Sequence, residues 1–398
     1  MRKSVWLIIL GLLYLITLEI MKVYWIMPFP GSQQSDSVSF AYFLHKNAWW
    51  LRVVGVILIT GPLLRSLAKG KFWQRTLLVL VILLYMFIYY LFNFRFLADK
   101  IFYEPKEKTF APALTDTTNK DKLVIGVILN NEAKAYPIEL IGYHHQVIDT
   151  MQQKPIMVTY CTVCRSGRVF NPFVNGKYEK FRLVGMDHFN AMFEDATTKS
   201  WWRQATGVAI AGKLKGHQLT EIPSTQMRLG EWLSMYPDSK IFQPDSNFKK
   251  QYAGLKGFDD GTIKGKLEHR DSSSWKNKSW VVGIAGKTKS RAYDWNELVK
   301  QKMIVDSLDE MPLLLTVEPH GKTFYALSRN LDGKVLQFVP GLTAGELEDM
   351  QTHSIWKLNG ACTRGPLQGK QLQRIQSYQE FWHSWKSFHP NTTTYQII

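Results

Sequence analysis

The feature of this sequence that most restricts its fold is a run of 19 residues without a charged side chain, from Thr76 to Phe94. A helix needs about 20 predominantly apolar residues to cross the hydrocarbon core of a bilayer. Two further apolar stretches of that length precede this run, over residues 5–26 and 48–67. The sequence therefore predicts three transmembrane helices, at about 5–26, 48–67 and 76–94, and an integral membrane protein in contact with the lipid bilayer.

The distribution of basic residues in the short loops predicts the orientation of these helices. Arg2 and Lys3 precede the first helix, and four Lys/Arg residues lie in the loop over 65–75. The loop over 27–49 contains only Lys46. Because loops rich in Lys and Arg stay in the cytoplasm, we expect the amino terminus inside and a cytoplasmic-membrane location. Everything after about residue 97 is then expected to be extracytoplasmic.

The net charge of +16 raises the alternative of nucleic-acid binding. A positive-inside anchor joined to a mildly basic soluble region explains this charge, and the chain has neither a Lys/Arg run nor a nucleic-acid fold signature. No nucleic-acid partner is therefore expected. Ser-His-Asp spacing, a phosphate loop and an HExxH motif are also lacking, so hydrolase and nucleotide-binding functions have no support.

Two segments of the soluble region match each other at an offset of 157 residues. Residues 124–127 (Val-Ile-Gly-Val) correspond to residues 281–284 (Val-Val-Gly-Ile), and residues 135–136 and 292–293 are both Ala-Tyr. Further along, Ser and Trp recur with the same spacing in 200–202 and 354–356. This pattern predicts a tandem duplication. The expected organisation is an anchor over 1–104, a first unit over 105–245, a connector over 246–280 and a second unit over 281–398.

Each unit has a mixed, strand-rich pattern, which predicts an α+β fold. The expected elements are strands over 123–129, 145–150 and 155–160, a helix over 138–144, and a hairpin of 168–174 with 177–184 across Asn175-Gly176. Helices are also expected over 225–236 and 377–388, with Thr225 and Ser377 as their amino-terminal caps.

A Cys-x-x-Cys motif distinguishes the first unit from the second. Cys161 and Cys164 follow the strand over 155–160, whereas the second unit has Glu318 and Gly321 at the corresponding positions. His145 likewise corresponds to a lysine, residue 302. Since positions shared by two copies tend to serve the fold, these unshared side chains are the candidate functional site.

Three chemistries are open for this motif. The first is thiol–disulfide redox chemistry, with Cys161 as nucleophile, Cys164 as resolving thiol, His145 as base and Arg165 stabilising a thiolate. The second is a site for a soft or borderline metal ion such as copper or zinc, with Cys161, Cys164, His145 and His188 as ligands. The third is a static disulfide in a non-enzymatic binding or scaffold module. Whether the protein is an enzyme stays open, and a membrane-protein or redox partner is expected.

Several segments resemble a known family, the domain of unknown function 3179. They are residues 132–137, 145–149, 158–164 and 209–212, together with Trp202, and the likeness extends from about residue 123 to the carboxyl end. The family typically has Pro-Leu between its cysteines and a small residue after them, where this chain has Thr162-Val163 and Arg165. The resemblance implies no established activity, and the membrane anchor lies outside it.

Overall fold

The computed structural model describes residues 2–396, and the side chains of residues 5–396. Met1, Ile397 and Ile398, which the domain bounds above include, lie outside the described residues, as do the side chains of Arg2 and Lys3. The chain forms two compact units, each built from two stretches of sequence. The first of these compact units comprises Met1–Tyr103 with Phe173–Leu219, and the second comprises Glu104–Pro172 with Thr220–Ile398. From here on, first unit and second unit refer to these two and not to the predicted repeats.

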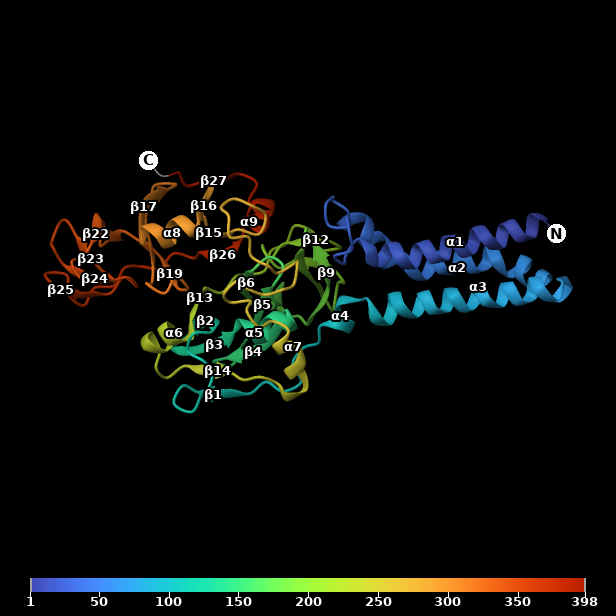
Figure 1. Cartoon of the computed structure of the whole chain (residues 1–398), viewed down its shortest axis with the longest axis horizontal. Coiled ribbons are helices and arrows are strands. Elements are labelled where there is room, and N and C mark those ends of the chain that lie inside the picture. The colour runs from blue at the N-terminus through green and yellow to red at the C-terminus, as the bar shows by residue number, and fades with distance from the viewer. Residues whose placement is uncertain (1, 397–398) are drawn as a thin grey trace. The chain divides into compact units, whose positions relative to one another are not determined.

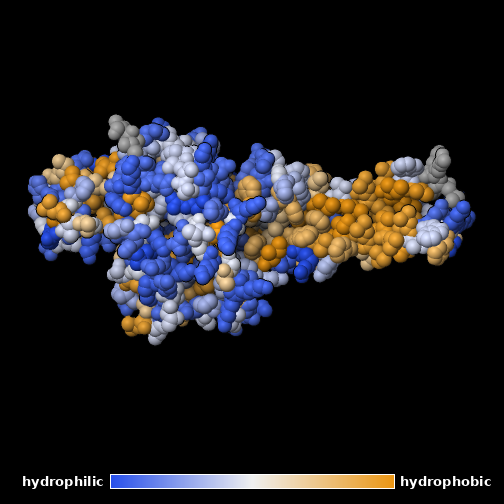
Figure 2. Space-filling view, viewed as in Figure 1, coloured by the Kyte–Doolittle hydropathy of each residue, from blue (hydrophilic) through white to orange (hydrophobic). Residues whose placement is uncertain are grey.

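Three long helices dominate the first unit (Figure 1). They are α1 (Arg2–Tyr24), α2 (Val38–Lys69) and α3 (Phe72–Tyr90), and α3 continues as the π-helical turn η1 (Leu91–Arg95), followed by α4 (Ala98–Ile101). All three are long and apolar enough to cross a membrane. Large apolar side chains stay exposed along them, which Figure 2 shows as a continuous hydrophobic surface. Such a surface is stable next to lipid and costly in water, so the expectation of membrane helices is supported.

Small residues let α1 and α2 approach closely. A Cβ atom on Gly11 would lie 2.1 Å from Cγ2 of Ile59, and one on Gly55 would lie 2.5 Å from Cδ2 of Leu15. Both glycines therefore receive a side chain of the facing helix, as is common where helices associate in lipid.

The second stretch of this unit forms a four-stranded antiparallel sheet in the order β12-β11-β10-β9. Its strands are β9 (Phe181–Asp187), β10 (Asn190–Asp195), β11 (Trp201–Arg203) and β12 (Ala209–Ala211). The sheet contacts the helices directly, because Met186 N–H donates a hydrogen bond of 2.7 Å to Ile26 O. The indole of Trp201 also makes an edge contact with Tyr42 at 5.1 Å between ring centroids.

The predicted long hairpin over 168–184 is wrong in its extent. The turn at Asn175-Gly176 is present, but only β7 (Phe173–Val174) and β8 (Lys177–Tyr178) pair across it. The residues before it form β6 (Ser166–Phe170), which pairs with a different strand, and those after it belong to β9. Pro172 separates β6 from β7, and a proline cannot donate a backbone hydrogen bond to a continuing ladder.

The second unit begins with a five-stranded sheet in the order β1-β14-β3-β2-β13 and a three-stranded sheet in the order β4-β5-β6. The strands are β1 (Phe110–Pro112), β2 (Leu123–Leu129), β3 (Glu132–Pro137), β4 (Gln146–Met151), β5 (Lys154–Cys161), β13 (Ser224–Arg228) and β14 (Lys240–Phe242). The helices are α5 (Ile138–His144), α6 (Leu229–Met235), the 3-10 turn η2 (Ser246–Phe248) and α7 (Lys249–Ala253).

Residues 280–394 add further small sheets to the same unit, in the orders β26-β15-β16-β27, β17-β18-β19, β20-β21 and β22-β23-β24-β25. The first of these strands are β15 (Trp280–Ala285), β16 (Ser290–Asp294), β17 (Met303–Leu308), β18 (Met311–Val317), β19 (Phe324–Ser328), β20 (Asn330–Leu331) and β21 (Lys334–Val335). The others are β22 (Phe338–Pro340), β23 (Glu346–Asp349), β24 (Ile355–Lys357), β25 (Cys362–Arg364), β26 (Tyr378–Phe381) and β27 (Thr392–Thr394), and the helices are α8 (Trp295–Gln301) and α9 (Trp382–Phe388). The soluble region is thus a strand-rich α+β structure, as expected.

The element order from β2 to β6 is the same as that from β15 to β19: two paired strands, a short helix and three antiparallel strands. In both stretches a glycine of the first strand lies under a tryptophan ring. A Cβ atom on Gly126 or on Gly283 would come within 2.2 Å of Trp232 or Trp385, respectively. Each glycine therefore leaves the space that the indole fills.

The predicted helices over 225–236 and 377–388 are wrong in their first halves. Residues 224–228 form β13, which pairs antiparallel with β2, and residues 378–381 form β26, which pairs with β15. Helix begins only at Leu229 and at Trp382. The strand pairing outweighs the local capping preference of Thr225 and Ser377, because tertiary context commonly overrides propensity.

Candidate functional site

The two cysteines of the motif lie on the tight turn between β5 and β6. Cys161 is the last residue of β5 and pairs with Ser166, the first residue of β6. Arg165, just before β6, has a left-handed backbone with φ of 54°. Both cysteine side chains are fully buried and no disulfide joins them. Exposure therefore does not distinguish the two thiols, although the sequence predicted Cys161 as the attacking group.

Residues far along the chain hold this turn in place. Cys164 O accepts a 2.9 Å hydrogen bond from Phe381 N–H at the end of β26. Val163 O, between the cysteines, accepts from Lys278 Nζ at 2.6 Å and lies 3.1 Å from Nε2 of His383. The turn is thus built into the interface between residues 154–170 and 278–384 of the second unit.

Burial governs the electrostatics of the thiols. It raises the pKa of Cys164 well above its ordinary value, and the hydrogen bond and charge of Cys161 act in the same direction, whereas a hydrogen bond with Ser384 acts against them. Burial also lowers the pKa of Lys278, although the nearby cysteines raise it. Since the thiolate is the reactive form, a raised pKa makes Cys164 a weak nucleophile at neutral pH.

His145 is hydrogen-bonded to β5, the strand that leads to Cys161. Its ring Nδ1 lies 2.9 Å from Tyr160 O, and Tyr160 N–H donates a 3.0 Å hydrogen bond to His145 O. Burial lowers the pKa of His145 to about 4, against a weaker opposing effect of the Tyr160 hydrogen bond. The imidazole is therefore neutral at physiological pH. Lys302 has the same left-handed backbone, and its carbonyl accepts from Val317 N–H at 3.1 Å.

Arg165 makes its contacts with the protein interior. Its guanidinium donates to Gln379 Oε1 at 3.1 Å, Phe258 O at 3.1 Å and Asp259 O at 3.2 Å. It also lies over the indole of Trp280 at 3.7 Å. These contacts occupy Nε, Nη1 and Nη2, so the geometry gives Arg165 a structural role beside its predicted role at a thiolate. Residues 246–280, expected to be a connector, thus supply three of its partners, Phe258, Asp259 and Trp280.

The predicted metal ligands are divided between the two compact units of the structure. Cys161, Cys164 and His145 lie in the unit formed by residues 104–172 and 220–398, whereas His188 belongs to the unit that contains the three long helices. There, Nδ1 of His188 lies 2.7 Å from Asp187 Oδ1, and this hydrogen bond raises the pKa of His188. Within residues 2–396, no group of three or more His, Cys, Asp or Glu side chains is arranged to hold a metal ion.

Sequence reasoning did not identify Lys278, His383 and Ser384 as neighbours of the motif. Lys278 and His383 are 115 and 220 residues from Val163, whose carbonyl both approach. No local pattern relates residues at such separations. The similarity of residues 124–127 to residues 281–284 was a signal that these stretches are related, but it does not specify which side chains meet.

Together these features define a class of protein: three apolar helices precede a strand-rich α+β region with a buried cysteine pair. The family model described as protein of unknown function (DUF3179) matches residues 104–392, which is most of the chain. The chain therefore belongs to the DUF3179 family, as the resemblance indicated, and the three helices lie before the matched region. No curated protein and no solved structure matches the chain.

Proposed function

We propose that this chain is a membrane-anchored protein whose soluble region lies outside the cytoplasm and whose Cys161–Cys164 pair cycles between dithiol and disulfide. The observation that carries the proposal is the placement of both buried cysteines on the one tight turn between β5, which ends at Cys161, and β6, which begins at Ser166. Cysteines two residues apart in such a turn can be bridged with little backbone movement. An oxidising compartment would sustain the disulfide form.

We also propose that the soluble region is a tandem duplication in which only the first copy carries the thiols. Two matched hydrogen bonds support this. Tyr136 Oη donates to Asp149 at 2.5 Å as Tyr293 Oη does to Asp306 at 2.7 Å. The second copy then keeps the framework and supplies the surface that buries the cysteine turn.

The reaction needs a partner disulfide of small-molecule or protein origin. Cys161, as thiolate, attacks one sulfur of that disulfide, whose S–S bond breaks and releases one thiolate. The thiolate of Cys164 then attacks the Cys161 sulfur of the mixed disulfide and releases the second thiolate. Both leaving groups take up the protons lost by the two cysteines, so the partner is reduced by two electrons to two thiols.

The two thiols are linked electrostatically, because the negative charge of a Cys161 thiolate raises the pKa of Cys164. Because both thiols are buried, oxidation requires the turn to open from Phe381 and Lys278. We therefore expect slow exchange, typical of a regulatory pair and unlike a fast oxidoreductase.

The test is thiol trapping of the full chain in detergent across glutathione buffers of graded potential, read by mass spectrometry. We expect residues 161 and 164 to interconvert as a two-electron couple in the native protein. Cys362→Ser is the matched control and should leave the midpoint unchanged, whereas Cys161→Ser should abolish the couple. A Cys161–Cys164 disulfide that resists reduction until the protein unfolds would show that the cysteines form a structural disulfide and would contradict the proposal. Thiols that stay reduced in every buffer would equally contradict the proposal, and a stoichiometric metal would favour ligation.

Orientation is tested with a single introduced thiol. Leu342 is fully exposed in the loop between β22 and β23, so Leu342→Cys in a background with serine at 161, 164 and 362 offers one reactive site. We expect a membrane-impermeant maleimide to label it in intact cells. Labelling only after lysis would place the soluble region inside the cell and overturn the proposed location.

A further inference from the structure

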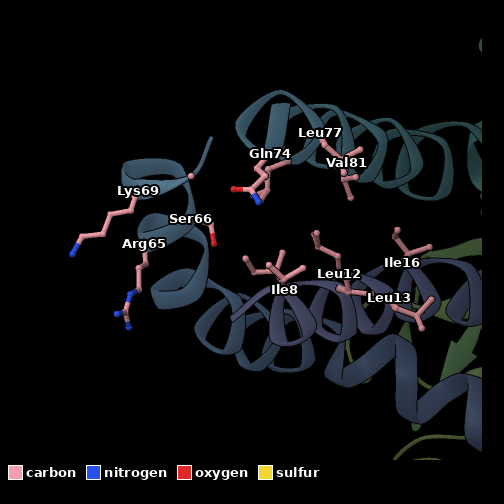
Figure 3. Close-up of a pocket in the computed structure, with 14 residues that line it drawn as sticks. Ile8, Leu12, Leu13, Ile16, Arg65, Ser66, Lys69, Gln74, Leu77 and Val81 are labelled. Carbon is pink, nitrogen blue, oxygen red and sulfur yellow. The ribbon is translucent and has the colours of Figure 1, made fainter. Parts of the chain in front are cut away.

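The first unit contains an apolar pocket of about 630 Å³ between α1 and α3, beside the end of α2 (Figure 3). Its walls are aliphatic: Ile8, Leu12 and Ile16 extend from α1 toward Leu77 and Val81 of α3. A half-open apolar groove between helices is suited to a hydrocarbon chain, because such a chain loses nothing on leaving bulk lipid and gains packing contacts.

The polar end of the pocket lies at the end of α2. Arg65 and Lys69 extend from that end away from the apolar walls, whereas Ser66 and Gln74 lie at the opening (Figure 3). Gln74 Oε1 accepts the 3.0 Å hydrogen bond of Lys71 N–H, so its amide N–H groups are the donors that it can offer to a ligand. The pocket is therefore amphipathic, with hydrocarbon walls and a cationic, hydrogen-bonding mouth.

Among the side chains of residues 5–396, Arg65 and Lys69 form no salt bridge. The pocket lining includes Arg65 and Lys69 but no Asp or Glu, and residues 37–98 contain no acidic residue at all. The neighbouring Arg75 is used in capping, since it donates to Gly70 O at 2.8 Å and Ala68 O at 2.9 Å. Basic pockets between transmembrane helices bind the head groups of anionic lipids for this reason.

We propose that this pocket binds one anionic phospholipid, with an acyl chain between α1 and α3 and its phosphate near Arg65 and Lys69. The charge of the mouth selects this occupant over a zwitterionic lipid or a neutral quinone, which would gain little from the two cationic side chains. The side chains of Arg65 and Lys69, which extend away from the apolar walls, are long and flexible enough to reach a head group at the membrane surface. This site is independent of the cysteine chemistry.

The experiment uses the full chain in nanodiscs of equal parts phosphatidylcholine and phosphatidylglycerol, followed by mild extraction and native mass spectrometry of the retained lipid. We expect one phosphatidylglycerol per chain, and a loss of retention of about fivefold for each of Arg65→Gln and Lys69→Gln. Lys46→Gln, on the same helix but outside the pocket lining, should retain the lipid fully. Leu12→Trp, which fills the pocket, should reduce retention without altering the charge.

Equal retention of the two lipids, or wild-type retention in both charge variants, would show that the pocket holds only passing bilayer lipid. Retention of a neutral lipid that Leu12→Trp alone abolishes would assign the pocket to a neutral occupant and would also overturn the proposal. Because Arg65 and Lys69 are exposed, their glutamine variants are expected to fold. These two variants therefore test the proposal even if the Leu12→Trp variant fails to fold.

Discussion

Arg52 of α2 donates two hydrogen bonds to the carboxylate of Glu19 of α1, from Nε at 2.6 Å and from Nη2 at 2.9 Å. Asn93, in the π-helical turn η1, donates to the same carboxylate at 2.8 Å, and Lys22 lies 3.1 Å from it. Glu19 is completely buried. The three helices that could cross the membrane thus meet at one buried acidic group, and π-helical turns often occur at such specialised positions.

We expect Glu19→Gln to destabilise the helix bundle by about 3–5 kcal/mol, because it leaves the buried Lys22 and the partly buried Arg52 without their counter-charge. Arg52→Lys should cost less, since it keeps the charge and loses only the paired geometry. Thermal unfolding in detergent, followed by circular dichroism, measures both. Lys46→Gln on α2 is the control, and a Glu19→Gln variant as stable as this control would contradict the assignment.

A second buried ion pair links β6 to β26 in the other unit. Arg168 donates to Glu380 at 2.5 Å and lies 3.4 Å from the ring centre of Tyr378. Glu380→Gln should cost about 3–5 kcal/mol, because the buried guanidinium loses its close counter-charge and keeps only Glu221, at 3.8 Å. The matched control is Arg364→Gln, which breaks an exposed pair with Glu346 and should cost no more than about 1 kcal/mol. Urea unfolding measures the free energy of unfolding that each variant loses. Equal losses in Glu380→Gln and Arg364→Gln would refute the prediction that the buried pair contributes more.

The glycines beneath the two tryptophans give a steric prediction. Gly126→Ala and Gly283→Ala should each destabilise the protein by about 1–3 kcal/mol, because the new methyl group overlaps an indole ring. Gly230→Ala is the control: its Cβ would meet no atom closer than 3.4 Å, and alanine favours the helix α6. Tryptophan fluorescence during unfolding reports the loss. A tolerated Gly126→Ala would mean that Trp232 lies elsewhere.

His145 predicts a pH dependence of stability. Its pKa is about 4 in the folded protein and 6.5 when unperturbed, so the unfolded chain binds the proton first as the pH falls. The stabilising contribution is therefore complete above about pH 6.5 and is lost between 6.5 and 4, on the order of 3 kcal/mol in total.

The variant for this test is His145→Asn, since asparagine tolerates the left-handed backbone at that position. It should lower stability at pH 7 but flatten its decline below pH 6.5. His353→Asn, at an exposed histidine, is the matched control and should leave the slope as in the wild type. Denaturation midpoints measured from pH 7 to pH 4.5 decide this, and parallel slopes for the two variants would count against a buried neutral imidazole.

Elements with a strong local pattern were predictable from the sequence. The strand over 123–129 and the helix over 138–144 have the predicted bounds, because apolar runs and turn residues delimit them. The helix start predicted at Thr225 was wrong, because threonine is common both as a helix cap and within strands. The sequence alone does not show that residues 224–228 pair with β2. The cysteine pair was evident from the Cys-x-x-Cys motif and from its absence at the matching positions near Glu318. Lys278 and His383 were not evident, since their contacts with Val163 arise only from packing between distant segments.

The composition of the first unit has a consequence for how the protein is made. Strand β9 contacts the end of α1 through the hydrogen bond of Met186 to Ile26, yet some 160 residues separate them in the chain. The inserted helices therefore cannot complete this unit until the ribosome has passed residue 211, the end of β12. A fragment beginning near residue 104 would carry β9–β12 without the surface that they cover. When the soluble region is expressed alone, the face of the β9–β12 sheet that contacts the helices is thus expected to be exposed and to promote aggregation.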